Sequence, residues 1–439
     1  MMRPLDPAER MTDRFDLAST LNFTIVAEVR GPLSEPQLVH ALRCLERRHP
    51  LLRAAVVRSE LEIGLLAGAA AAIPLQVRDA SSAQVLELAA ASIDHAAWVD
   101  DGPRAHLTWL RHGPHHGTLL LRLHHVVSDG SSGMLAMRDL LSFLTQRELA
   151  SVQPLASPGQ EAFFPSSHAQ TRARFVEAAR ANIRPPPVEP ALRLSRFAPG
   201  EFAARRVRVR RLTLTVDESS RLLARARRDR ATVHGVLAAA LAYAVCDEQG
   251  AAGLQRIAHA IDLRRYLAER EPEGTPVGDA VGYYVSGIGT EHRVDVARPL
   301  GEQAAAITAA VRAAKAAGEP LISAPLRGAD LVERTRGMPL DAFRELAEQR
   351  IFSDTFGITN LGPLERLGLR TQVGELEVLD LFFVAAQSVM SQLGASAVSF
   401  AGRISLQLTA VEPLIAVAVL DRLAERSRAL LVGYAAREE

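Results

Sequence analysis

A strand, a tight turn and a helix follow one another between residues 118 and 144, and this segment constrains the fold of the 439-residue chain most. Every second residue of its first part belongs to one largely apolar set: Leu119, Leu121, Leu123, His125 and Val127. This alternation predicts a strand over residues 118–127. Asp129-Gly130 then breaks the pattern, and apolar residues at helical spacing up to Leu144 predict a helix capped by one of the serines that follow.

Two adjacent histidines stand near the end of this strand. The alternation places His125 on the apolar face and His124 on the opposite face, so we expect only His125 to be buried. A neutral imidazole on a rigid element can take a proton from a bound nucleophile near neutral pH. A histidine on an apolar face is more often a packed core residue, and Asp-Gly is a common turn, so each feature alone also fits a structural role.

The combination is more specific than its parts, because this residue pattern is expected by chance only about once in a thousand chains of this composition. His124-His125-x-x-x-Asp129-Gly130 resembles the HHxxxDG signature of the chloramphenicol-acetyltransferase-like superfamily. That superfamily includes peptide-synthetase condensation domains, plant BAHD acyltransferases, wax ester synthases and polyketide-associated acyltransferases. The resemblance implies an α/β fold with two chloramphenicol-acetyltransferase-like lobes. Each lobe would be a mixed sheet with helices, and the two would form a V with a channel between them.

The resemblance also implies roles for the motif residues. It names His125 as the general base and gives the other motif residues a structural role: His124, Asp129 and Gly130. In the superfamily, a strand of the second lobe ends in an arginine that pairs with the motif aspartate. By this correspondence the partner of Asp129 is Arg264, and the arginine that follows it in the sequence is the alternative.

Three further segments are similar to superfamily sequences. One is the segment that follows the first long helix, residues 48–53. The proline there is enough to end the helix, so the segment needs no catalytic role and we expect His49 to be scaffold. The second is residues 281–286. The third is Phe356–Pro363, which we expect to lie between two strands of the second lobe. Together with the motif they supply our candidates for channel-lining residues: Ser128, Tyr283, Ser286 and Asn360.

The chain is long enough for two domains of about 200 residues each. Between residues 151 and 200 the periodic patterns weaken and prolines accumulate, with three in a row at 185–187. We therefore expect an N-terminal acyltransferase lobe over 1–183, a proline-rich crossover linker over 184–205 and a C-terminal acyltransferase lobe over 206–439. Consecutive prolines favour an extended connector, which would leave a cleft between the lobes.

Composition and charge exclude several classes of partner. The formal net charge is only +1, so nothing predicts nucleic acid or an anionic membrane as a partner. The longest apolar-looking run, residues 65–75, is too short to span a bilayer, and the N-terminus lacks the apolar core of a signal peptide. Two cysteines inside predicted helices, Cys44 and Cys246, are typical of a reduced cytoplasmic protein, which we expect to be a monomer.

Three more histidines, at positions 112, 115 and 116, lie close together between two predicted strands. No cysteine or carboxylate joins them at the spacing of metal ligands, and the Gly-Pro-His-His-Gly run is typical of a turn. We therefore expect a solvated loop there and no metal site.

The leading hypothesis is an acyltransferase that forms an ester without a bound cofactor. The co-substrate would be a phosphopantetheine-linked acyl thioester, on coenzyme A or an acyl carrier protein, and His125 would deprotonate an acceptor alcohol or amine. The chain has no G-x-S-x-G elbow and no cysteine near the motif, which disfavours a hydrolase. No adenylation or carrier domain is present on it, which favours ester formation over a peptide-synthetase module. Two alternatives stay open: a free-standing enzyme that forms amides, and a non-catalytic member that binds a carrier protein.

Overall fold

The structure is a computed structural model, and the account below concerns the residues that it describes. These are residues 2–19, 21–57, 62–64, 72–94, 102–145, 152–155, 157–160, 191–194, 202–267, 278–321, 331–351, 353–385 and 391–436. Most of the predicted crossover linker lies outside these residues.

The first lobe is built on a six-stranded sheet, the N-terminal sheet, with the strand order β12-β13-β2-β7-β6-β5. It is mixed, because β5 runs parallel to β6 while the other neighbours are antiparallel. Its strands are β2 (Asn22–Arg30), β5 (Leu75–Asp79), β6 (Ala105–Gly113), β7 (His116–His124), β12 (Gln372–Val373) and β13 (Leu376–Ala385).

The second lobe is built on another six-stranded mixed sheet, the C-terminal sheet, with the order β10-β9-β11-β14-β15-β8. Here β11 lies between two parallel neighbours, β9 and β14. The strands are β8 (Arg206–Thr213), β9 (Gly253–Asp262), β10 (Val285–Val294), β11 (Phe356–Pro363), β14 (Leu393–Phe400) and β15 (Arg403–Glu412). The expected architecture of two mixed sheets with helices is confirmed.

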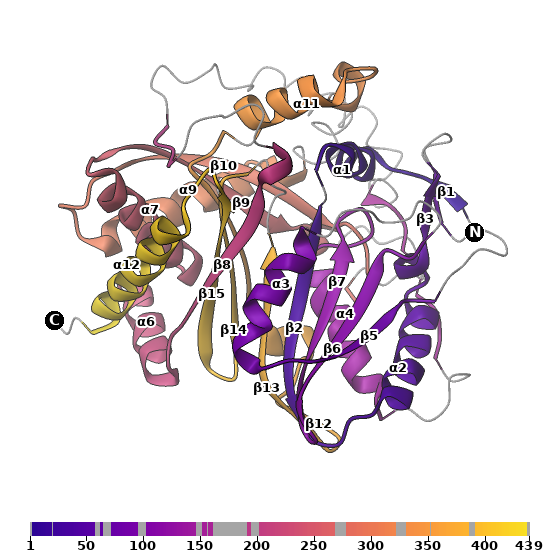
Figure 1. The fold of residues 1–439 in the computed structure, drawn as a ribbon. Helices are drawn as coiled ribbons and strands as arrows, with labels where there is room; N and C mark the ends of the chain where they lie inside the picture. The colour runs from indigo at the N-terminus through magenta and orange to yellow at the C-terminus, as the bar shows by residue number, and fades with distance from the viewer. Residues whose placement is uncertain are drawn as a thin grey trace.

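Helices cover both sheets (Figure 1). In the first lobe α4 (Gly130–Phe143) packs on the N-terminal sheet and against α2 (Glu35–Arg48), whereas α3 (Val85–Ile93) lies between that sheet and β8. Four helices gather on one face of the C-terminal sheet, on the left in Figure 1: α6 (Val216–Arg228), α7 (Val233–Gln249), α9 (Leu300–Ala316) and α12 (Val417–Ala436). Helix α3 is therefore in contact with strands of both lobes.

The remaining elements are short or lie at the top of the molecule. A small sheet consists of β1 (Met2–Pro4), β4 (Glu62–Gly64) and β3 (Ala55–Val57), and α8 (Arg264–Leu267) is a single turn directly after β9. Helix α1 (Pro7–Ala18) lies beside α11 (Leu340–Leu346), with the ring centroids of Phe15 and Phe343 5.4 Å apart (Figure 1). A π-helical turn, Ala347–Ile351, continues α11.

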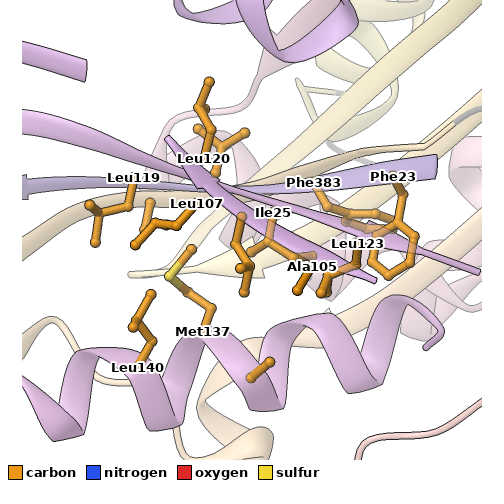
Figure 2. Packing of buried hydrophobic residues seen from close by; sticks show 14 of the residues in the cluster. Phe23, Ile25, Ala105, Leu107, Leu119, Leu120, Leu123, Met137, Leu140 and Phe383 are labelled. Atoms are coloured by element: carbon orange, nitrogen blue, oxygen red, sulfur yellow. The ribbon is translucent and has the colours of Figure 1, made fainter. Parts of the chain in front are cut away.

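The core of the first lobe forms between the strands and α4, as Figure 2 shows with Met137 and Leu140 pointing from the helix toward the sheet. A glycine lets α4 approach this closely. A Cβ atom on Gly133 would lie 2.7 Å from the Phe23 ring and 2.8 Å from Ile25, closer than packed atoms allow. The start of α4, which directly follows the histidine motif, therefore packs closely on β2.

One expected boundary is wrong. The predicted C-terminal lobe over 206–439 includes β12 and β13, but both belong to the N-terminal sheet, where β13 pairs with β2 from Phe23 to Arg30. The hydrophobic residues of β13 are buried in that sheet. Because an apolar strand is stabilised wherever both its faces are covered, the sequence pattern of β13 does not show which of the two sheets it joins. The two lobes are therefore interleaved along the sequence.

Both cysteines are free and buried, Cys44 in α2 and Cys246 in α7. In the part of the chain that the structure describes, no helix combines the length and the hydrophobicity that crossing a membrane requires.

Candidate active site

The histidine motif forms a turn between β7 and α4. The strand ends at His124, not at Val127 as the alternation predicts, and residues 125–127 are turn residues. Val126 and Val127 are nevertheless fully buried, which is why their apolar character continued the strand pattern in the sequence. Hydrogen bonds within the turn decide its shape, including one from the Ser128 hydroxyl to the His124 carbonyl, 2.9 Å.

The expectation that only His125 is buried is wrong, because His124 is the more buried of the two. Its side chain lies on the α3 face of the sheet and is 1% exposed, and its Nε2 is 2.8 Å from Oδ1 of Asp16 in α1. The Val126 backbone N–H donates to its Nδ1 over 3.0 Å. Since a ring nitrogen that accepts carries no proton, the neutral His124 ring holds its proton on Nε2, toward Asp16.

His125 lies on the Phe23 side of the sheet, the face that the alternation assigned to it, but it is only half-buried. Its ring is 4.7 Å from the Phe23 ring centroid and 6.3 Å from that of Tyr283, which meets it edge-on. Nδ1 is 3.2 Å from the Ser128 carbonyl oxygen, which can only accept, so the proton of the neutral ring is on Nδ1. Nε2 then carries a lone pair and has no hydrogen-bond partner among the described residues.

The pKa of His125 is lowered to about 4, mainly because burial disfavours the charged ring. The neighbouring His124 acts in the same direction, and the contact with Ser128 opposes both. The imidazole is therefore neutral, and able to accept a proton, throughout the physiological pH range.

Asp129 caps α4 and binds the second lobe. Its Oδ1 accepts the Ser132 N–H over 2.7 Å, its Oδ2 accepts the Tyr284 N–H over 2.7 Å, and Arg264 Nη1 lies 3.1 and 3.2 Å from the two oxygens. Burial raises the pKa of the Asp129 carboxyl, and the Arg264 guanidinium counteracts this. The contact between Asp129 and Arg264 that the resemblance implied is thus present, and it joins residues from the two halves of the chain.

Two serines extend this junction. The Ser132 hydroxyl donates to the Gly282 carbonyl over 2.6 Å and accepts from Arg264 Nη2 over 2.6 Å. The Ser131 hydroxyl donates to Asp262 at the end of β9 over 2.7 Å. The first turn of α4 is therefore fixed to the second lobe at several points, and His125 lies directly before that anchor.

The channel candidates divide into two groups. The Ser128 side chain is fully buried and bonded inside the turn, so it is not presented to a substrate, and Ser286 is also buried. Tyr283 lies beside His125, and burial raises the pKa of its phenol to about 12, so that the hydroxyl stays protonated. Asn360 accepts the Gly362 N–H over 2.8 Å, and no hydrogen bond or ring contact joins it to the histidines among the described residues.

The segment that contains Asn360 is itself strand β11, not a connection between strands. Asn, Gly and Pro at its end suggested a turn, but the parallel pairing with β14 continues to Pro363 across an irregularity. The segment still reaches the motif, because Leu361 side-chain atoms lie 3.4 Å from the position that a Cβ of Gly130 would take.

His49 is scaffold by its contacts, as expected. It is fully buried and its Nε2 is 2.8 Å from Oδ2 of Asp139 in α4. Arg138, the neighbour of Asp139, donates to Asp279 of the second lobe over 2.9 Å. The segment after α2 thus supports the helix that directly follows the motif turn.

A second group of histidines lies in the C-terminal lobe, and no motif in the sequence pointed to it. His234 Nε2 is 2.8 Å from His259 Nδ1, and the Thr290 hydroxyl is 2.8 Å from Nε2 of both His259 and His292. We call these four residues the histidine chain. Burial lowers the pKa of His234 to about 4 and that of His259 to about 2, so both rings are neutral.

Within the described ranges, no three His, Cys, Asp or Glu side chains are arranged to hold a metal ion. The predicted solvated loop around His112 and His116 is instead the end of two strands. His112 contacts the Ala80 carbonyl and Thr118, and His116 Nε2 is 2.7 Å from Glu28. The expected serine cap of helix α4 is wrong: its N-cap is Asp129, and Ser132 lies inside the first turn, where its N–H donates to Asp129. Asp16 and Ser132 were not among the candidate site residues, and no motif marks Asp16, which lies in the last turn of α1.

Two mixed sheets joined across a histidine turn define a chloramphenicol-acetyltransferase-like fold, and the comparisons with known proteins agree. Residues 203–424 match the family described as the phthiocerol/phthiodiolone dimycocerosyl transferase C-terminus, and residues 11–178 match the condensation domain. Because the first match covers half of the chain, this protein belongs to that transferase family. The family matches are a transferase C-terminus and a condensation domain, and the structural neighbours include condensation domains, an O-acetyltransferase and an epimerization domain.

Individual proteins are more distant. A plipastatin synthase of Bacillus subtilis (strain 168) is 28% identical over 134 residues, which are 30% of this chain and only 5% of that protein. The chain therefore matches a small part of the length of this curated relative.

Solved structures resemble the chain over nearly its whole length. The condensation domain of the monacolin K polyketide synthase has a TM-score of 0.71 at 15% identity, covering 99% of this chain and 97% of that one. Polyketide synthase associated protein 5 of Mycobacterium tuberculosis gives 0.67 at 18%, covering 100% and 98%. Trichothecene 15-O-acetyltransferase of Fusarium sporotrichioides gives 0.69 at 14%, covering 99% and 95%. Identities this low show the fold alone.

Proposed function

We propose that this protein transfers an acyl group from a thioester to an acceptor hydroxyl, forming an ester, with His125 as the general base. One observation carries the proposal. The Ser128 carbonyl fixes the proton of the His125 ring on Nδ1, which leaves the Nε2 lone pair available. A half-buried imidazole of this kind, on a turn anchored to both lobes, has the geometry of a base for a bound alcohol.

In the proposed reaction, His125 Nε2 takes the hydroxyl proton as the acceptor oxygen attacks the thioester carbonyl carbon. The tetrahedral intermediate then collapses, the carbon–sulfur bond breaks, and the imidazolium returns the proton to the departing thiolate. Ester and free thiol are the products, and no covalent intermediate with the protein forms. A positioned base of this type is worth about a hundredfold to ten-thousandfold in rate.

The low pKa of His125 supports this role in two ways. The base is fully unprotonated at neutral pH, since its pKa is lowered to about 4 by burial. The imidazolium formed during the reaction is then a strong acid, which favours return of the proton to the thiolate. A tetrahedral oxyanion also needs a donor, and the Gly130 N–H and the Asn360 amide are our candidates.

The proposed donor is a phosphopantetheine-linked acyl thioester on a carrier protein or on coenzyme A, and no bound cofactor takes part. Transfer to oxygen is the activity named for one protein of the same fold, a trichothecene 15-O-acetyltransferase. A second candidate is amide formation on an amine acceptor, which the condensation-domain match over residues 11–178 favours because that match contains the histidine motif. A non-catalytic role in binding carrier protein would leave the open Nε2 of His125 without a use.

The test is a matrix of acyl thioesters, on coenzyme A and on a loaded carrier protein, against alcohols and amines, with products identified by mass and free thiol measured in parallel. We expect an ester product, with release of one thiol for each acyl group transferred. His125→Gln is the inactive comparison, and His115→Gln, at an exposed turn position, is the matched control. Amide products would select the second candidate, and carrier-protein binding without any transfer would contradict an enzymatic role.

A further inference from the structure

Helix α1 is held firmly at its first turn. Asp6 and Glu9 form a reciprocal capping box, Arg3 binds both Glu9 oxygens, and the Gln160 N–H donates to the other oxygen of Asp6. Side chains along one face of the helix are buried, among them Thr12 and Phe15. The helix therefore has a fixed position beside the histidine turn and is not a loose N-terminal segment (Figure 1).

The last turn of α1 contacts the motif through Asp16. Its Oδ1 is 2.8 Å from Nε2 of His124 and also accepts the Leu21 N–H over 3.0 Å. Thr12, one helical turn earlier on the same face, lies near the Tyr283 phenol and acts to lower its pKa, against the larger effect of burial. Helix α1 is thus next to one residue of each lobe, His124 and Tyr283.

A continuous set of contacts leads from Asp16 to the His125 ring. The Asp16 carboxylate attracts the Nε2 proton of His124, which keeps His124 Nδ1 free to accept the Val126 N–H. That bond and the Ser128 hydroxyl bond to the His124 carbonyl shape the turn. The turn in turn places the Ser128 carbonyl 3.2 Å from His125 Nδ1.

We propose that Asp16 is a positioning residue of the acyl-transfer site, acting through His124 to set the tautomer and orientation of His125. This inference rests on the proposed function of His125 as the base. Asp16 touches no reacting atom. Its role is to fix which nitrogen of His124 carries the proton. In the other tautomer the proton would be on His124 Nδ1, and two N–H donors, this one and that of Val126, would face each other.

The experiment compares Asp16→Ala and Asp16→Asn with the wild type. Asparagine keeps an oxygen acceptor at the same position, whereas alanine removes it, so we expect Asp16→Asn to retain most of kcat. Asp16→Ala should lower kcat about tenfold to a hundredfold with KM unchanged, the cost of a misplaced catalytic group. Asp16→Ser, which keeps a short polar side chain that cannot reach His124, replaces the alanine variant if that one does not fold.

The matched control is Arg14→Met on the same helix. Arg14 donates to the Met338 carbonyl over 2.7 Å and stacks over the Phe343 ring, so its loss loosens α1 without touching the motif. We expect the control to lower the melting temperature while kcat stays unchanged. Parallel loss of kcat in Arg14→Met and Asp16→Ala would show that Asp16 only stabilises the helix, and would overturn the proposal.

A second readout does not depend on turnover. ¹⁵N NMR of histidine-labelled protein distinguishes the two nitrogens of a neutral imidazole, and the His125 signals are assigned from their loss in His125→Gln. The wild type should show the proton on Nδ1, and Asp16→Ala should show a mixture of tautomers. An unchanged Nδ1 proton in Asp16→Ala would refute the positioning role, whereas an absence of acyl transfer in the wild type would refute the proposed function alone.

Discussion

At the motif turn, each imidazole has a partner that orients it, and His125 keeps one nitrogen open. In the histidine chain of the C-terminal lobe, His259 uses both ring nitrogens, one on His234 and the other on Thr290, and His292 bonds the same hydroxyl. His125 is half-buried while His259 is 1% exposed. The same side chain therefore serves two purposes, and the state of the second nitrogen distinguishes them.

The comparison shows that a lowered pKa by itself does not identify a base. Burial lowers the pKa of His125 and of His234 to about 4 in both cases. What differs is the surroundings: the motif turn is anchored across the two lobes by Asp129 and Arg264, whereas the histidine chain lies inside one lobe, between α7 and strands β9 and β10. The following predictions separate the two arrangements.

The largest effect on stability is expected from the anchor of the motif turn. Arg264→Ala leaves Asp129 as a buried carboxylate without its cation, which should lower the free energy of unfolding by about 3–5 kcal/mol in denaturant titrations. Arg30→Ala, which breaks the exposed pair with Glu377, is the control and should cost only about 0.2–1 kcal/mol. Equal losses in the two variants would mean that the anchor between the lobes contributes no more than a surface ion pair.

The open nitrogen is tested by His125→Ala. We expect acyl transfer to fall at least about a hundredfold because the base is lost, with a melting temperature close to that of the wild type since the ring is only half-buried. Steady-state kinetics and thermal unfolding are measured on the same preparation. Full activity in this variant would remove His125 from the mechanism.

The histidine chain should respond in the opposite way, with a loss of stability and no loss of activity. His259→Ala leaves His234 and Thr290 without their shared partner, which should lower the free energy of unfolding by roughly 1–3 kcal/mol while kcat is unchanged. His115→Ala, at an exposed position, should leave stability within about 0.5 kcal/mol. A large fall in kcat for His259→Ala would erase the distinction between the two groups.

The pH dependence of kcat/KM tests whether His125 is the base and whether its pKa is lowered. A base must be unprotonated, so the rate falls when pH drops through its pKa, and the pKa of His125 is lowered to about 4. We expect no loss of kcat/KM between pH 8 and about pH 5.5. An unperturbed histidine, by contrast, is half protonated near pH 6.5 and would lose activity within this range. An acid limb centred near pH 6.5 would show that the ring is solvated.

The smallest effect is the pH dependence of stability contributed by the histidine chain. His234 and His259 have folded-state pKa values below the ordinary value, so the unfolded chain binds more protons as pH falls below about 6.5. Stability from these groups is complete above that pH and declines toward pH 4. Comparing unfolding at pH 8 and pH 5 should give a smaller difference for His259→Gln than for the wild type, and an equal difference would contradict the assignment.

Local patterns predicted what local interactions decide. The alternation up to Leu123 and the helical spacing after Gly130 correspond to β7 and α4. The contact between Asp129 and Arg264 was available only through the resemblance, because nothing local marks which arginine meets a given carboxylate. The strand end was misjudged because two turn residues, Val126 and Val127, are buried and so imitate a strand.

Contacts between segments that are distant in the sequence could not be predicted from hydrophobic periodicity. Asp16 meets His124 although more than a hundred residues separate them, and on its own a polar residue near a helix end predicts only a solvated face. The histidine chain joins α7, β9 and β10 in a similar way, with no spacing that any motif would record. Such pairs arise from the arrangement of the elements in space, which the sequence encodes only through the whole fold.

The place of β13 in the N-terminal sheet matters for the order in which the protein can fold during synthesis. Strand β2 leaves the ribosome long before its partner β13, which is made only after β11 of the other lobe. Until then β2 has an unpaired apolar edge, which is prone to pairing with other chains. A fragment that ends before residue 372 should therefore aggregate, and the motif turn should mature only after β13 has been made.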